Sequence, residues 1–259
     1  MGDCAPKMRN DAAPWSDFDA DAYAKVNYAT VLPEDEEIIR FATSFLVRAC
    51  GEHPPVGRAV DVGAGPNLYP ALLMLPWTRH LVFTEYSSAN IDWLTKNLTD
   101  APGEWAWQPF WDMMAGLPGY RSVTQPRQRL AAGHDIVHSS VFDLPRNAWD
   151  LGTMFFVADG ISSDQTEFES AVRSFLGALT PGSPFLMAFM EGSAGYDVSG
   201  VQFPSVTVSE RSLAELIATL PVTGVSVLRT DNSVRPLRSG YDAMLTVAGH
   251  RVDRSRERP

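Results

Sequence analysis

The sequence has few cysteines and an excess of acidic over basic residues. Of its 259 residues only Cys4 and Cys50 are cysteines, which favours one free and one buried thiol over a disulfide. The 21 Lys and Arg residues stand against 31 Asp and Glu, giving a formal net charge of -10. Nucleic acids and anionic membrane surfaces attract proteins that carry a positive field, so neither is an expected partner.

Long apolar runs and the common catalytic motifs are also missing. The chain has no H-E-x-x-H, no cysteine pair at zinc spacing and no G-x-S-x-G, since Gly192-Ser-Ala-Gly195 has its serine one place too early. The segment up to Trp15 holds no secretory pattern, and the charge-free run 174–190 is broken by Pro181 and Pro184. These absences predict a soluble, cytoplasmic protein with no metal site and no covalent catalytic intermediate.

The strongest signal is the stretch Arg58-Ala-Val-Asp-Val-Gly-Ala-Gly-Pro-Asn-Leu-Tyr69. An apolar strand ends in Asp61, turns through Gly63 and Gly65, and reaches Asn67, whose residue type caps helices. A strand, a tight turn and a helix start in this order form a nucleotide-type binding site. The lysine of a phosphate-binding loop and the third glycine of a dinucleotide turn are both missing. A carboxylate before such a turn suits a cationic group better than a pyrophosphate.

A second acidic strand end follows the glycine turn. The strand His80-Leu-Val-Phe-Thr-Glu85 is apolar, and Glu85 follows Gly65 by 20 residues. Rossmann-like units place a ribose-binding carboxylate ~20 residues after the turn. We therefore expect Glu85 to accept hydrogen bonds from two vicinal hydroxyls of a ribose.

The apolar pattern predicts one α/β domain with a Rossmann-like, mostly parallel sheet covered by helices on both faces. Strands are expected at 58–62, 80–85, 135–140, 150–157, 185–191, 222–228 and 241–248. Helices are expected at 67–75, 88–98, 164–179 and 209–220. Ligands of such sheets bind outside the carboxyl ends of the strands, so we expect the site at that edge.

The residues at these two strand ends resemble a known family. Asp61-Val-Gly-Ala-Gly-Pro-Asn-Leu-Tyr69, followed by Thr84-Glu-Tyr-Ser87 and Asn90, is similar to the small-molecule methyltransferases that include the nicotinamide, phenylethanolamine and thioether enzymes. The resemblance extends from Asp21-Ala-Tyr-Ala-Lys-Val-Asn-Tyr28 to Tyr241-Asp-Ala-Met-Leu-Thr-Val247 and so covers most of the chain. It implies S-adenosylmethionine as the methyl donor and a seven-stranded sheet whose last strand is antiparallel.

With this family in view, the chain divides into three parts. Residues 1–51 are expected to form a helical cap over the donor site, and residues 52–250 the methyltransferase domain. That domain contains an aromatic-rich insert at 100–133. Residues 251–259 form a charged tail, which we expect to be solvated.

The resemblance also implies which residues contact the donor. They are Tyr23, Tyr28, Gly63, Gly65, Asn67, Tyr69, Glu85, Tyr86 and Asn90. The ends of the first and fourth strands add Asp61 and Phe155 to this set.

A further donor contact is expected after the third strand. The family has an acid there that holds the adenine amine, and the aligned residue in this chain is Ser140, followed by Val141 and Phe142. Asp143 lies close enough to be the true counterpart. Its alternative role is that of a turn residue that faces solvent before Pro145.

For the methyl acceptor, the resemblance implies an acid at the end of the fifth strand, where this chain has Glu191. We expect Glu191 to act as the catalytic residue, orienting the acceptor nitrogen and taking up its proton directly or through water. The alternative is a strand-end acid exposed to solvent. Trp107 of the insert, with Asp159, Tyr196 and Phe203, is expected to contact the acceptor.

The sequence therefore predicts an S-adenosylmethionine-dependent methyltransferase that acts by in-line transfer on nitrogen of a small aromatic or amine metabolite. Methylation of carbon in an indole-type ring is the nearest variant. A nicotinamide-cofactor oxidoreductase and a donor-binding protein without catalysis are alternatives of other classes. The incomplete glycine motif and the lack of a Tyr-x-x-x-Lys sequence disfavour the oxidoreductase. The identity of the acceptor and the oligomeric state stay open.

Overall fold

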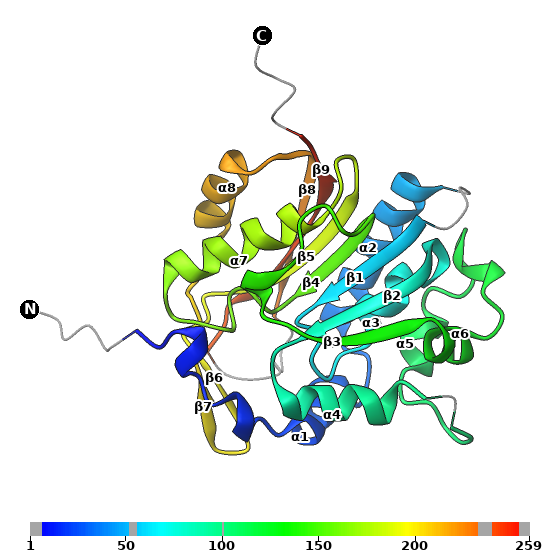
Figure 1. The fold of residues 1–259 in the computed structure, drawn as a ribbon, viewed down its shortest axis with the longest axis horizontal. Coiled ribbons are helices and arrows are strands. Elements are labelled where there is room, and N and C mark those ends of the chain that lie inside the picture. The colour runs from blue at the N-terminus through cyan, green and yellow to red at the C-terminus, as the bar shows by residue number, and fades with distance from the viewer. Residues whose placement is uncertain (1–6, 52–55, 100, 233–239, 254–259) are drawn as a thin grey trace, which may run out of the picture.

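A seven-stranded sheet with the order β3-β2-β1-β4-β5-β9-β8 forms the centre of the protein (Figure 1). The computed structural model describes residues 7–51, 56–99, 101–232 and 240–253. The strands are β1 (Val56–Val62), β2 (Thr78–Glu85), β3 (His134–His138), β4 (Leu151–Phe155), β5 (Pro184–Glu191), β8 (Val222–Asp231) and β9 (Ala243–Arg251). The strands from β1 to β5 pair in parallel, whereas β9 is antiparallel to both of its neighbours. The predicted mostly parallel sheet with an antiparallel last strand is confirmed.

Helices cover both faces of the sheet (Figure 1). One face carries α2 (Pro33–Cys50), α3 (Tyr69–Met74) and α4 (Ser88–Asn97), and the other carries α7 (Gln165–Ala178) and α8 (Glu210–Thr219). The connection between β3 and β4 holds only the short 3-10 turn η5 (Val141–Asp143) in place of a covering helix. All four helices predicted from the pattern are present, with ends shifted by a residue or two.

Local chemistry explains where several of these elements begin. Ser87, Asp164 and Ser209 precede α4, α7 and α8, and the side chain of each accepts a hydrogen bond from the backbone N–H two or three residues later. This bond satisfies a donor that the first helical turn leaves without an intrahelical partner. In β5, every side chain from Pro184 to Met190 is buried, as expected for a strand in the middle of a sheet covered on both faces.

Segments outside the alternating core complete the fold. Before α2 come the 3-10 turns η1 (Asn10–Ala12) and η2 (Trp15–Asp17) and helix α1 (Ala20–Tyr28). The insert forms α5 (Gln108–Asp112), η4 (Tyr120–Ser122) and α6 (Pro126–Ala132), and α3 runs into the 3-10 turn η3 (Leu75–Trp77). A small hairpin, β6 (Tyr196–Val198) and β7 (Val201–Phe203), follows β5 and was not predicted.

Two expected boundaries need correction. Helix α2 lies within the expected N-terminal cap but packs against β5, β8 and β9, so it belongs to the sheet's covering layer. The sequence predicts that Arg251 belongs to the charged tail, but Arg251 is the last residue of β9, pairs with Val222 of β8 and is buried. The tail residues 254–259, like Cys4, lie outside the described part of the chain, whereas Cys50 is a buried free thiol.

Candidate methyl-transfer site

The glycine turn after β1 is fixed by hydrogen bonds to the end of β2. Gly63 and Gly65 have φ values of 62° and 54°, which residues with a side chain rarely adopt. The Gly63 N–H donates to the Thr84 carbonyl oxygen at 2.8 Å, and a Cβ on Gly63 would lie 2.6 Å from a methyl group of Val157. The turn therefore needs glycine at position 63 for both its conformation and its space.

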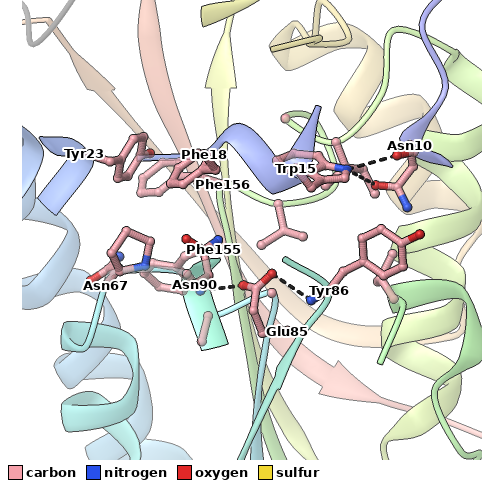
Figure 2. A pocket seen from close by; sticks show the side chains of 18 of the residues that line it. Asn10, Trp15, Phe18, Tyr23, Asn67, Glu85, Tyr86, Asn90, Phe155 and Phe156 are labelled. Carbon is pink, nitrogen blue, oxygen red and sulfur yellow. Dashed lines mark hydrogen bonds between the residues drawn. The ribbon is translucent and has the colours of Figure 1, made fainter. Parts of the chain in front are cut away.

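Glu85 links this turn to the start of α4. Its Oε2 accepts from the Gly65 N–H at 2.8 Å, and its Oε1 accepts from the N–H groups of Tyr86 at 2.7 Å and Ser87 at 2.8 Å. The Asn90 side chain also donates to it (Figure 2). Burial raises the pKa of Glu85, and these four hydrogen bonds oppose that rise. Glu85 thus organises the backbone around the site while its carboxylate faces the cavity.

Asp61, at the strand end before the turn, is a second buried carboxyl group. Thr153 donates from Oγ1 to Asp61 Oδ1 at 2.6 Å. Burial raises the pKa of Asp61 to about 7, the Thr153 bond lowers it and the charge of Glu85 raises it. Within the described residues, Asp61 Oδ2 and the nearby Tyr69 Oη are buried without a hydrogen-bond partner. Buried polar atoms without partners are costly, so this region is suited to a polar ligand group.

A cavity of about 760 Å³, its open mouth included, lies at the carboxyl edge of the sheet. Figure 2 shows Asn67, Phe155, Asn90 and Glu85 on one side of it. The predicted residues that line it are Tyr23, Tyr28, Gly63, Gly65, Asn67, Glu85, Tyr86, Asn90, Val141, Phe155 and Tyr196. Among all the described residues that line the cavity, Glu85 is the one acid, and there is no Lys, Arg or His. The cavity therefore favours neutral or cationic ligand groups over anions.

Several lining residues were not predicted from the sequence. Asn10, Trp15 and Phe18 come from the segment before α1, and Figure 2 shows them across the cavity from Glu85. Phe156 follows β4 with φ at 58°, an uncommon conformation for a residue with a side chain. Ser139 and Ile161 also contribute. The one sequence signal for the role of the N-terminal segment is its aromatic content, because this segment contacts residues that lie far along the chain.

Tyr69 and Trp107 lie one layer behind the cavity wall. The ring centroid of Tyr69 lies 6.0 Å from that of Tyr28, and the ring centroid of Trp107 lies 5.5 Å from that of Tyr28. Phe110 stacks on Tyr69 at 5.6 Å. Burial raises the pKa of Tyr28 and of Tyr69 well above 10, so both hydroxyls stay neutral. The structure does not bring Trp107 to the cavity, and the insert instead packs against Tyr28, which lines it.

The segment after β3 reaches the cavity through Ser139 and Val141 on either side of Ser140. Ser140 is the N-cap of η5, where its Oγ accepts from the Phe142 N–H at 3.2 Å. Phe142 is half-buried against the α7 side of the sheet, and Asp143 is exposed. Ser140, Phe142 and the alternative Asp143 are therefore not among the lining residues.

Glu191 is held away from the cavity. Its Oε2 accepts from Arg229 Nε at 2.7 Å, and its Oε1 accepts from the Glu210 N–H at the start of α8 at 3.0 Å. It is not among the lining residues, because these two contacts turn it toward β8 and α8. The expected contact with the acceptor is absent in this arrangement, where Glu191 caps α8.

Asp159 and Phe203 lie behind residues that line the cavity. Asp159 is buried and accepts from the Met190 N–H at 2.8 Å, next to the lining residue Gly160. The Phe203 ring stacks on Tyr196 at 5.3 Å and packs 5.3 Å from Trp15. Both residues shape the aromatic side of the cavity through these neighbours.

A family model described as the NNMT/PNMT/TEMT family matches residues 8–235. The chain belongs to this family. It is therefore an S-adenosylmethionine-dependent methyltransferase, as the resemblance predicted, and the oxidoreductase and non-catalytic alternatives are set aside. Among the described residues, no three His, Cys, Asp or Glu side chains gather where they could hold a metal ion. Within the same ranges, no helix has the length and apolar character that crossing a membrane requires.

Individual relatives of this methyltransferase are distant. It is 22% identical over 200 residues to a nicotinamide N-methyltransferase of Sus scrofa, a match that covers 72% of this chain and 74% of that enzyme. It is 27% identical over 95 residues to an indolethylamine N-methyltransferase of Mus musculus, covering 36% of each chain.

Solved structures share the fold. A methyltransferase from Clostridium acetobutylicum superposes with a TM-score of 0.53 at 12% identity, covering 90% of this chain and 98% of that one. The N-methyltransferase NodS from Bradyrhizobium japonicum gives 0.51 at 11% identity, covering 91% and 100%.

The residues present fit S-adenosylmethionine. S-adenosylmethionine carries an ammonium group and two vicinal hydroxyls, which need hydrogen-bond acceptors. It also carries a carboxylate, which needs hydrogen-bond donors. Asp61 Oδ2 and Tyr69 Oη are buried polar atoms that lack partners beside the glycine turn. The described residues of the lining include no basic side chain, which suits a sulfonium cation, a group that the faces of aromatic rings attract.

Proposed function

We propose that this methyltransferase transfers the methyl group of S-adenosylmethionine to a nitrogen of a small aromatic or amine acceptor. The observation that carries the proposal is that one cavity joins the glycine turn and Glu85 to a wall of aromatic rings formed by Phe18, Phe156 and Tyr196. The relatives named as N-methyltransferases support nitrogen as the target. The donor half and the acceptor half of such a reaction must share one enclosed space.

The lining of the cavity also restricts the acceptor. Among the described residues that line the cavity the one acid is Glu85, which already accepts four hydrogen bonds and so offers no free general base. An acceptor nitrogen must then enter without a proton on its lone pair, which favours weakly basic aromatic nitrogens over strongly basic alkylamines at neutral pH. Flat rings also gain from contact with the aromatic wall.

The bound donor supplies an activated methyl group on sulfur, and the chain's own residues position the two partners. We propose that Asn67 and the glycine turn hold the amino-acid end of the donor, with Asp61 and Tyr69 directly behind them. We further propose that Glu85 holds the ribose, whose hydroxyls take the place of the Asn90 side chain as its hydrogen-bond donor. Ser139 and Val141 would contact its base. The aromatic rings exclude water and orient the acceptor, which is the main contribution that in-line transfer needs.

Incubation with donor carrying a labelled methyl group tests this proposal. The panel comprises pyridine-type and aniline-type nitrogens, alkylamines, indoles and thioethers, with mass spectrometry locating the methyl group in each product. We expect label on nitrogen, with the weakly basic aromatic acceptors converted fastest. Label on an indole carbon would favour the carbon-directed variant, and label on sulfur would contradict nitrogen as the target.

The cytoplasmic location stays a prediction from the sequence.

A further inference from the structure

The segment from Met8 to Phe18, here called the roof, spans the cavity between the starts of α7 and α4. It contributes Asn10, Trp15 and Phe18 to the lining. Figure 2 shows Trp15 and Asn10 facing Glu85 and Tyr86 across the cavity. The Trp15 ring also packs 5.3 Å from Phe203, so the roof continues the aromatic wall. A ligand in the cavity lies beneath this segment.

Glu167, in the first turn of α7, is the buried anchor of the roof. In a capping box, a Glu at this position reaches back to the backbone N–H of the N-cap residue. Here the Asp164 N–H donates to Ser162 Oγ at 3.0 Å instead, which leaves the Glu167 carboxylate free to face the roof. Its Oε1 accepts from Arg9 Nε at 2.8 Å, and its Oε2 accepts from the Asn10 N–H at 2.9 Å.

Glu167 is charged in this setting although it is only 9% exposed. Burial acts to raise its pKa, but hydrogen bonds from Ser162, the Asn10 backbone and Arg9 outweigh it, so the pKa lies below its usual value. A charged acceptor makes stronger hydrogen bonds than a neutral one. The bond to the Asn10 backbone is therefore the firmest link between α7 and the lining part of the roof.

From Asn10, hydrogen bonds continue across the mouth of the cavity. Trp15 Nε1 donates to the Asn10 carbonyl oxygen at 2.9 Å and to Asn10 Oδ1 at 3.2 Å. Ser87 Oγ donates to the Trp15 carbonyl oxygen at 2.9 Å, and the Ser87 N–H donates to Glu85 at 2.8 Å. An unbroken series of contacts thus joins Glu167 on one side of the cavity to Glu85 on the other.

We propose that Glu167 is a positioning residue that holds the roof closed over the bound ligands through Asn10 and Trp15. The inference rests on the proposed function in taking the cavity as the donor site. Loss of the carboxylate releases Asn10 and Arg9, while the backbone bonds of Met8 to Ser163 keep the start of the segment in place. The structural change is therefore confined to the roof, and its measurable effect is a faster dissociation of the bound ligand.

The test compares Glu167→Ala with Glu169→Ala, using S-adenosylhomocysteine as the probe and stopped flow to measure its dissociation rate. Glu169 is on the same helix and is half-exposed, and its carboxylate pairs with Gln165 and Arg173 of that helix, so it is a matched control. We expect dissociation about tenfold faster from Glu167→Ala, as for loss of one charge-assisted hydrogen bond. Glu167→Gln keeps an acceptor for the Asn10 N–H and should restore most of the slow rate. Equal rates in Glu167→Ala and Glu169→Ala would overturn the proposal.

A second measurement separates this proposal from the proposed function. If the unmodified protein does not bind S-adenosylhomocysteine, the donor site is refuted, and hydrogen exchange of residues 8–18 then tests the roof alone. Faster exchange in Glu167→Ala than in Glu169→Ala supports the anchor. Identical exchange in the two variants contradicts it, and circular dichroism establishes that both are folded.

Discussion

Replacing Glu85 with alanine tests the link between the glycine turn and donor binding. The change removes a carboxylate that accepts from the backbone N–H groups of Gly65, Tyr86 and Ser87 and from Asn90. Hydrogen bonds to charged groups contribute about 1.5–3 kcal/mol each, and the freed N–H of Gly65 lies in the turn that faces the ligand. We expect donor affinity to fall by about 1–3 kcal/mol, or roughly 5- to 150-fold.

Glu85→Gln sharpens this prediction. A carboxylate offers about four acceptor positions, and all four of the donors named above point at Glu85. A glutamine side chain replaces one acceptor oxygen by an NH₂ donor, which would face a backbone N–H. We therefore expect Glu85→Gln to weaken donor binding about as much as Glu85→Ala does.

Isothermal titration with S-adenosylmethionine measures both variants against Asp92→Ala, which replaces an exposed acid on α4, the helix that follows Glu85. Asp92→Ala should bind the donor as the unmodified protein does. Unchanged affinity in Glu85→Ala, with circular dichroism showing a folded protein, would refute the role given to Glu85.

Three further substitutions test other parts of the site. The pKa of Asp61 is raised to about 7, so its contribution to stability is full below about pH 4 and is lost as the pH rises through 7. Asp61→Asn should gain roughly 3 kcal/mol relative to the unmodified protein between pH 5 and pH 8 in urea unfolding, and an equal pH dependence would refute the raised pKa. Glu191→Ala should lower Tm because Arg229 and the start of α8 lose their hydrogen-bond partner, while kcat with saturating acceptor stays within about threefold of the unmodified value. A much larger loss of kcat would show that Glu191 acts on the acceptor. Phe156→Ala should raise KM for the acceptor and leave the donor Kd unchanged, since its ring lines the aromatic side of the cavity. An unchanged KM would contradict a contact between Phe156 and the acceptor.

Much of the sheet could be predicted because buried strands carry nearly continuous apolar runs. β5 is the clearest case, since its side chains are buried on both faces and flanked by Pro181, Gly182 and Gly192. The donor side of the site could also be predicted, because the strand end, the glycine turn and Glu85 are local features at fixed spacing. The β6–β7 hairpin escaped notice since its strands have three residues each, too few to show an alternating pattern.

The acceptor side could not be read in the same way. A strand-end acid looks the same in sequence whether it faces a cavity or caps a helix, and Glu191 caps α8 because Ser209 and Glu210 return to the end of β5. Trp107 packs behind Tyr28 for a similar reason, since the path of the insert decides which ring faces the ligand. Asn10 is held at the cavity by Glu167, which is 157 residues away in sequence, and Trp15 is linked to Glu167 through Asn10.

A crystal structure with S-adenosylhomocysteine tests the central claim most directly. The account predicts density in the cavity, with the ribose hydroxyls at Glu85, the amino-acid end against Gly63, Asn67 and the Asp61 side of the turn, and the roof closed above it. Density for the ligand at any other place on the protein, or an empty cavity at saturating ligand, would contradict the assignment of this cavity as the methyl-donor site.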